Sequence, residues 1–108
     1  MKFIKWTIKN NRKRKHPALV FAESDDGLLF NLGLTHSRKR GHHKNLMIHD
    51  PTDWNNFSYV RDDLALDENI FLRIMLVNYK LHPEDYKKIW ESIIIKKNKK
   101  CAPLGGSH

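Results

Sequence analysis

The chain has 108 residues, of which 40% are hydrophobic and 30% charged, the proportions of a globular domain rather than a disordered segment. Its 20 lysines and arginines outnumber 12 aspartates and glutamates, and the net charge of +8 favours polyanionic partners such as nucleic acid. The single cysteine, Cys101, excludes an internal disulfide framework and a cysteine-built zinc site, and no apolar run approaches the roughly 18 residues of a transmembrane helix.

These totals predict one domain over residues 1–100, followed by a flexible C-terminal tail over residues 101–108. We expect a cytoplasmic protein, because a lone cysteine suits a reducing compartment and Lys5 and Lys9 interrupt any signal-peptide core. The positive charge also has two roles that do not involve nucleic acid. A lysine-rich surface can serve solubility alone, and a basic amphipathic helix can lie on a membrane surface.

The first elements are predicted from hydrophobic periodicity. Residues 3–9 alternate apolar and polar side chains, which predicts a strand, and a cationic turn follows. Residues 16–24 carry a continuous apolar run, Ala18 to Ala22, typical of a strand covered on both faces. After the turn sequence SDDG, residues 28–34 alternate again and predict the second strand of a hairpin.

The second half predicts shorter elements and one helix. Residues 45–49 and 57–60 are expected as short strands, separated by a loop over residues 50–56. Residues 70–77 are expected as a strand, with the start of a helix as the alternative. Pro83 marks a first helical position, and an apolar stripe follows at helical spacing, made by Tyr86, Ile89, Trp90, Ile93 and Ile94.

The predicted fold is mainly β with a C-terminal helix (α+β), as a small bent antiparallel sheet or an SH3-like partly open barrel. Strands one and three run in the same direction, so the loops that follow them lie at one end of the sheet. Both loops are cationic, and together they suit a phosphate backbone. The predicted nucleic-acid-binding residues there are Arg12, Lys13, Lys15, Arg38, Lys39, Arg40 and Lys44.

Three residues between the third strand and its cationic loop are candidates for chemistry. If the strand continues, alternation places Thr35 and Ser37 on one face and His36 on the other. Thr and Ser at a strand end also commonly satisfy turn backbone groups, and that alternative stays open. Trp54, in the polar loop, either stacks on a base or caps the core.

The order of segments resembles the PemK/MazF family of small-barrel toxins, which are ribosome-independent endoribonucleases. KHPALVF, at residues 15–21, resembles the family's RPALV strand, and LGLTHSRKRGHHKN, at 32–45, resembles its Thr-Ser strand end and basic loop. SYVRDDLALDE and KLHPEDYKKIWESI resemble the later segments, so the similarity spans roughly residues 3 to 95. The chain departs from the pattern at His16, at the inserted His36, and at NNRKRK in place of a Gly-rich segment. The Thr-x-Ser pattern is also similar to ToxN-type toxins, whose inhibitor is an RNA.

The resemblance implies metal-independent, sequence-preferring cleavage of single-stranded RNA by attack of a 2′-hydroxyl, with no cofactor. Arg14, or Arg12, would stabilise the phosphorane, Thr35 and Ser37 would position the phosphate, and His36 or His16 would transfer protons. It also implies an antitoxin, either protein or RNA, and a homodimer.

A second function stays open: a non-catalytic small-barrel nucleic-acid-binding protein of a phage or mobile element. No metal site is predicted, because the spacing of His42, His43, His49 and Asp50 matches no common ligand pattern.

Overall fold

The computed structural model describes residues 1–97. The predicted domain boundary at residue 100 and the predicted tail over residues 101–108 therefore lie outside the described residues. The strands are β1 (Lys2–Asn11), β2 (His16–Glu23), β3 (Leu29–Thr35), β4 (Lys39–Arg40), β5 (His43–Lys44), β6 (Leu46–Asp50), β7 (Asp53–Asp67) and β8 (Ile74–Met75). The helical segments are a 3-10 turn, η1 (Asn69–Phe71), the helix α1 (Pro83–Ile89) and a π-helical continuation, η2 (Trp90–Ile94).

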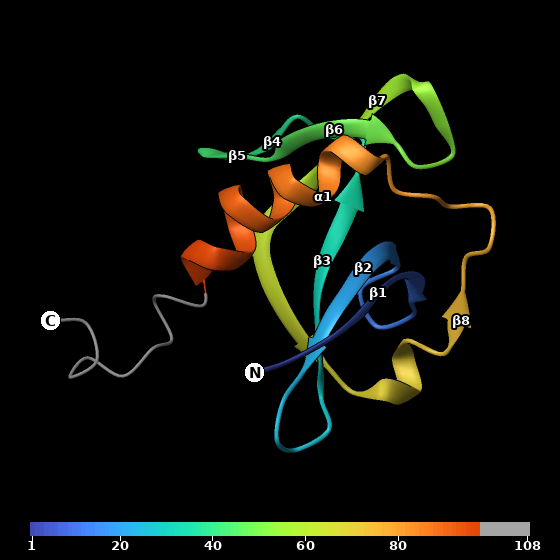
Figure 1. Ribbon diagram of the computed structural model, residues 1–108, viewed down its shortest axis with the longest axis vertical. Helices are drawn as coiled ribbons and strands as arrows, with labels where there is room; N and C mark the ends of the chain where they lie inside the picture. Colours follow the sequence, from blue (N-terminus) through green and yellow to red (C-terminus); the bar gives the residue numbers. More distant parts are fainter. Residues whose placement is uncertain (98–108) are drawn as a thin grey trace, which may run out of the picture.

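Six strands form one antiparallel sheet in the order β6-β7-β3-β2-β1-β8, and β4 and β5 form a separate small hairpin (Figure 1). The predicted class, mainly β with a C-terminal helix, is confirmed. The sheet is not closed into a barrel, so the open, bent sheet is the form that the chain adopts.

Two predicted elements are wrong. Residues 50–56 are not a loop, because the chain turns tightly at Pro51 and Thr52 and β7 begins at Asp53. Residues 70–77 are not one strand, since they contain the end of η1 and only two strand residues. Their apolar pattern misleads because Leu72 is buried whereas Ile74, Met75 and Val77 stay exposed.

The main core lies between one face of the sheet and the C-terminal helix. The strands contribute Leu19, Phe21, Leu32, Leu34, Ile48 and Val60, and the helical segments contribute Ile89, Ile93 and Ile94. A smaller cluster on the other face combines Ala18, Val20, Leu29 and Leu72. Strand β2 therefore buries side chains on both faces, as its continuous apolar run predicts.

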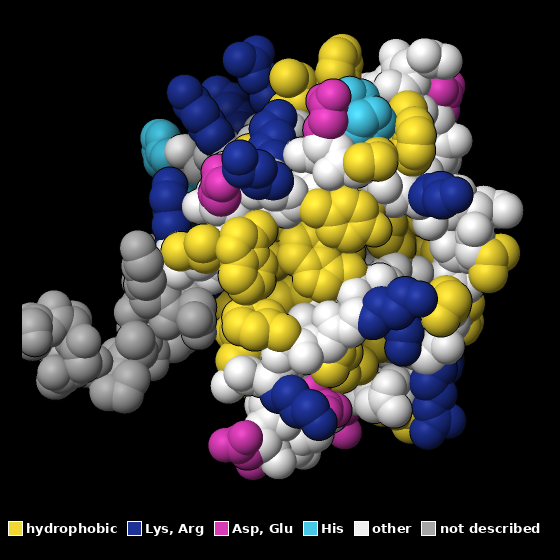
Figure 2. Space-filling model, in the orientation of Figure 1, with side chains coloured by type: hydrophobic (Ala, Val, Ile, Leu, Met, Phe, Trp, Pro, Cys, Tyr) yellow, Lys and Arg dark blue, Asp and Glu magenta, His cyan; other side chains and the backbone are white. Residues whose placement is uncertain are grey.

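The helix begins where the sequence predicts. Pro83 is its first residue, and the His82 ring nitrogen Nδ1 accepts a hydrogen bond from the Glu84 backbone N–H at 3.1 Å. The Tyr86 ring stays half-exposed and stacks on Trp6, with 5.1 Å between ring centroids. Figure 2 shows a hydrophobic area on the side of the molecule that carries α1. Within residues 1–97, no helix combines the length and apolar character required to cross a bilayer.

Candidate nucleic-acid interface

The sheet face opposite α1 carries the polar side chains of the candidate site. Leu32 and Leu34 of β3 pack in the main core, so Gly33 and Thr35 between and after them face the other side. The same alternation places His16 on this face, two residues before Ala18, and Arg61 next to the core residue Val60. Strands β2, β3 and β7 thus present this set side by side.

Two adjoining hollows share His16, Thr35 and Ser37. The first, of about 290 Å³, is also lined by His36, Asp50, Thr52, Ser58 and Tyr79. The second, of about 340 Å³, is also lined by Lys39, Arg40, Asn45 and Arg61. The structure therefore brings together four predicted catalytic residues and two predicted binding residues, which the chain supplies from three strands and a loop.

His36 lies in the same hollow as Thr35 and Ser37, although alternation predicts the opposite face. The prediction fails because β3 ends at Thr35, so the period-two pattern does not reach Ser37. The His36 ring nitrogen Nε2 lies 3.2 Å from Asp50 Oδ2. A carboxylate in this position orients the imidazole ring.

Asp50 is itself held in place by Thr52. The backbone N–H and the hydroxyl of Thr52 donate to Asp50 Oδ1 at 2.8 and 2.7 Å. Burial alone would raise the pKa of the Asp50 carboxyl, but the hydrogen bonds from Thr52 and His36 outweigh it and hold the pKa below its ordinary value. Asp50 thus stays ionised and offers one oxygen to each neighbour.

Thr35 serves the turn and lines the hollow at the same time. Its Oγ1 accepts a hydrogen bond from the Ser37 backbone N–H at 3.1 Å, and its carbonyl accepts one from the Ser58 hydroxyl at 3.0 Å. The first bond matches the turn-satisfying alternative. A hydroxyl that accepts one bond retains its own hydrogen, so Thr35 can still donate to a bound phosphate.

Arg14 is bound to a buried carboxylate. Its Nε and Nη2 donate to the two oxygens of Asp67 at 2.8 and 3.0 Å, and Asn11 and Asn31 donate to Asp67 Oδ2 at 2.9 and 3.1 Å. Burial alone would raise the pKa of Asp67, but these hydrogen bonds and the charge of Arg14 outweigh it and lower the pKa to about 2. The hydrogen bond to Asp67 likewise raises the pKa of Arg14 against the effect of burial. Arg14 lines a neighbouring hollow with His16, Arg40 and Arg61, but much of its charge neutralises Asp67.

Two of the remaining cations of the first turn, Arg12 and Lys13, contact η1. The Arg12 backbone N–H donates to the Phe71 carbonyl at 2.9 Å, and Lys13 Nζ lies 5.8 Å above the Phe71 ring. Lys15 adopts a left-handed backbone with φ of 59°, and its backbone N–H donates to the Asn11 carbonyl. Arg38 and Lys44 are exposed at the second cationic loop, where the Arg38 carbonyl accepts from the Asn45 backbone N–H.

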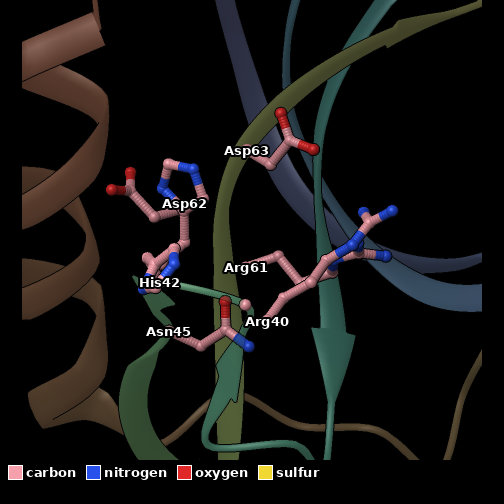
Figure 3. Close-up of a pocket in the computed structure, with 8 residues that line it drawn as sticks. Arg40, His42, Asn45, Arg61, Asp62 and Asp63 are labelled. Atoms are coloured by element: carbon pink, nitrogen blue, oxygen red, sulfur yellow. The ribbon is translucent and has the colours of Figure 1, made fainter.

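Arg61 is a candidate site residue that the sequence patterns do not reveal. The pairing of β3 with β7 shifts between Leu32 and Leu34, so β7 carries extra residues opposite Gly33. A Cβ at Gly33 would lie 2.9 Å from Arg61 Cδ, and the glycine therefore gives the arginine its path across the sheet. Figure 3 shows the side chains of Arg40 and Arg61 extending toward β3. The one sequence feature that could have indicated this arrangement is Gly33 itself. A glycine inside an apolar strand often marks a place where another group approaches the backbone closely.

Trp54 lies in β7, not in a loop, and covers the start of α1. Its Nε1 donates to the Lys80 carbonyl at 2.8 Å, and its ring meets the His82 ring edge-on at 4.6 Å. The residue is still 42% exposed, so these contacts leave part of it open to solvent. It lies at the hairpin that joins β6 and β7, at the end of the sheet's edge strand.

His49, His82 and Glu84 have ligand atoms within 4.8 Å of one another. The two imidazole rings stack at 3.9 Å with 16° between their planes, so one ion cannot lie in both ring planes. His82 Nδ1 also already accepts the helix-capping bond. We therefore assign no metal to this group.

Comparison with protein-family models, with curated proteins and with solved structures finds no match to this chain. The resemblance to the PemK/MazF family stays a prediction, and the function has to be argued from the site itself.

Proposed function

We propose that the protein is a metal-independent endoribonuclease that cleaves single-stranded RNA at the hollow between His16 and His36. The observation that carries the proposal is the lining of the two adjoining hollows. The first contains the imidazoles of His16 and His36 and the hydroxyls of Thr35 and Ser37. The second, which we call the cationic groove, adds the side chains of Lys39, Arg40 and Arg61. Cleavage by transesterification requires a base, an acid and charge stabilisation, and this set of side chains supplies all three.

The roles follow from the contacts. The 2′-hydroxyl attacks the adjacent phosphorus while His36 takes its proton, and Asp50 stabilises the imidazolium that forms. The bond from phosphorus to the 5′-oxygen breaks, and His16 gives that oxygen a proton. The products are a 2′,3′-cyclic phosphate and a 5′-hydroxyl.

Charge on the phosphorane is stabilised by the cations beside Thr35. Arg40 and Arg61 line that hollow together with Lys39. An arginine fork matches two phosphate oxygens, which suits a pentacoordinate phosphorus better than a single ammonium does. The role that the resemblance gives to Arg14 therefore passes to Arg40 and Arg61, because Arg14 is paired with Asp67.

The test is incubation of the protein with mixed-sequence RNA in EDTA. We expect fragments that end in a cyclic phosphate, and substitution His36→Ala or His16→Ala should slow cleavage by about 10²–10⁴-fold without loss of RNA binding. An RNA with 2′-deoxy sugars at the cleaved positions should bind and remain intact. Cleavage that needs a divalent cation, or that both histidine variants retain, would contradict the proposal.

One observation favours the second candidate, a non-catalytic nucleic-acid-binding protein. Arg14 and Thr35 both make structural hydrogen bonds, so two residues of the predicted catalytic set already serve the fold. Salt-sensitive binding of RNA that stays intact would select this alternative. The toxin–antitoxin setting, the antitoxin and the homodimer are carried by the family resemblance alone and stay predictions.

A further inference from the structure

A hollow of about 470 Å³ lies beside the proposed cleavage site, between the β4–β5 hairpin and β7 (Figure 3). It shares Arg40 and Arg61 with the hollow of about 340 Å³ that Thr35 also lines. Unlike that neighbour, it also contains two carboxylates, those of Asp62 and Asp63. Acidic groups in the middle of a cationic face indicate a ligand group other than phosphate.

The two carboxylates lie on different sides of strand β7 (Figure 3). The side chains of Arg40 and Arg61 extend toward β3, and Asp63 lies on that side of β7, whereas Asp62 lies on the other side (Figure 3). A phosphate is attracted to the arginines and repelled by the carboxylates. A nucleotide whose phosphate contacts the arginines therefore turns its base, not its phosphate, toward the neighbouring Asp63.

The two aspartates differ in their partners. Asp62 Oδ1 lies 3.5 Å from Lys97 Nζ, which neutralises part of its charge. Among residues 1–97, Asp63 makes neither a hydrogen bond nor an ion pair through its side chain, and it lines this hollow and the one next to Arg14 and His16. Its carboxylate is thus available as an acceptor at the junction of the two hollows.

We propose that this hollow binds a guanine base of the RNA and that Asp63 accepts hydrogen bonds from it. A carboxylate at neutral pH only accepts, and guanine presents two adjacent donors, N1–H and the N2 amino group, on its Watson–Crick edge. Adenine and cytosine place an acceptor beside their single amino group, and uracil has one N–H between two carbonyls. The His42 and His43 rings on the hairpin provide flat surfaces for the base.

This inference rests on the proposed function and gives it a base preference. The test uses four hexaribonucleotides, UUNUUU with N as G, A, C or U, with 2′-fluoro sugars that prevent cleavage. Fluorescence anisotropy at fixed salt should show that the G hexamer binds about tenfold more tightly than the others, the effect of one bidentate base contact. Asp63→Asn should remove this preference.

Asp62→Asn is the matched control, because it removes the same charge from the neighbouring residue and should keep the preference. Equal affinity for the four hexamers, or a guanine preference that survives Asp63→Asn, would overturn the inference while leaving RNA binding intact. The comparison of hexamers on the unsubstituted protein stands even if a variant fails to fold.

Two further outcomes concern the ligand. Failure of every hexamer to bind would overturn the proposed function together with the inference. The mononucleotide 5′-GMP should compete far more weakly than the G hexamer, because it lacks the neighbouring phosphates. Equal competition would overturn the assignment of the hollow to RNA, since the ligand would then be a free guanine nucleotide.

Discussion

Asp67 carries a charge that the fold encloses completely. Its side chain is fully buried, and three residues, Arg14, Asn11 and Asn31, donate hydrogen bonds to it. Its pKa is lowered to about 2 in the folded protein, against roughly 3.9 in an unfolded chain. The unfolded chain therefore binds the proton more readily, and the stabilising contribution is complete above pH ~4 and lost as the pH falls through ~2.

We predict that Asp67→Asn lowers the free energy of unfolding by about 2–3 kcal/mol at neutral pH. The gap between the two proteins should shrink between pH ~4 and pH ~2, because protonation removes the charge from the unsubstituted protein too. Urea denaturation at a series of pH values measures this gap. Asp26→Asn, at the exposed turn between β2 and β3, is the control and should show no such change. A gap that stays constant on acidification would contradict the prediction.

Sequence patterns identify site residues only where the neighbours lie close along the chain. Thr35, His36 and Ser37 are consecutive and stand beside a basic loop, so they can be recognised. Asp67 and Arg61 cannot, because Asp67 meets Asn11 across 56 residues and Arg61 reaches the site through a register shift opposite Gly33. Such pairings depend on strand register, which a single sequence does not state.

Among the elements, α1 is attached to the sheet through polar contacts as well as through its apolar stripe. The buried Asp85 accepts hydrogen bonds from the His49 backbone N–H at 2.9 Å and from the His49 ring at 3.1 Å. Lys88 Nζ donates to the Met47 carbonyl one turn further along. The helix therefore completes the edge strand β6, which has no strand on its outer side among the described residues.

We predict that Asp85→Ala lowers the free energy of unfolding by about 1–3 kcal/mol, because it leaves a backbone N–H of β6 without its partner. Glu84→Ala is the matched control. It removes an exposed acid from the same helical turn and should cost only about 0.3–1 kcal/mol. Urea denaturation gives both values, and hydrogen exchange at the His49 amide should accelerate only in Asp85→Ala. Similar losses in the two variants would show that Asp85 acts through the helix dipole alone.

Element prediction succeeds where local pattern and tertiary placement agree. The apolar side chains of residues 3–9 and 28–34 alternate along the chain, and Ile8, Leu32 and Leu34 among them lie in the main core. The helix has Pro83 at its start. The continuous 15-residue strand β7 is not predicted, because its charged residues 61–63 interrupt the alternation. Residues 70–77 fail for the opposite reason, since their apolar side chains suggest burial that the fold does not provide.

At the scale of the whole molecule, RNA affinity has two candidate sources. One is long-range attraction by the net charge of +8, and the other is direct phosphate contact in the cationic groove. Two triple variants separate these causes, because each removes three positive charges and leaves a net charge of 8 − 3 = +5. The first replaces Lys39, Arg40 and Arg61 by Gln, all of which line one hollow. The second replaces Lys2, Lys5 and Lys87 by Gln, which are exposed on β1 and α1.

We predict that the groove variant loses most of its affinity for a 2′-fluoro oligonucleotide, whereas the control variant binds nearly as well as the unsubstituted protein. Each single-strand phosphate contact contributes ~0.7 to the slope of log affinity against log salt, so losing three contacts should reduce that slope by about 2. Anisotropy titrations over a range of salt concentrations measure both quantities. Long-range attraction by net charge would weaken the two variants equally and leave their slopes alike. A difference confined to the groove variant therefore requires direct phosphate contacts at Lys39, Arg40 and Arg61.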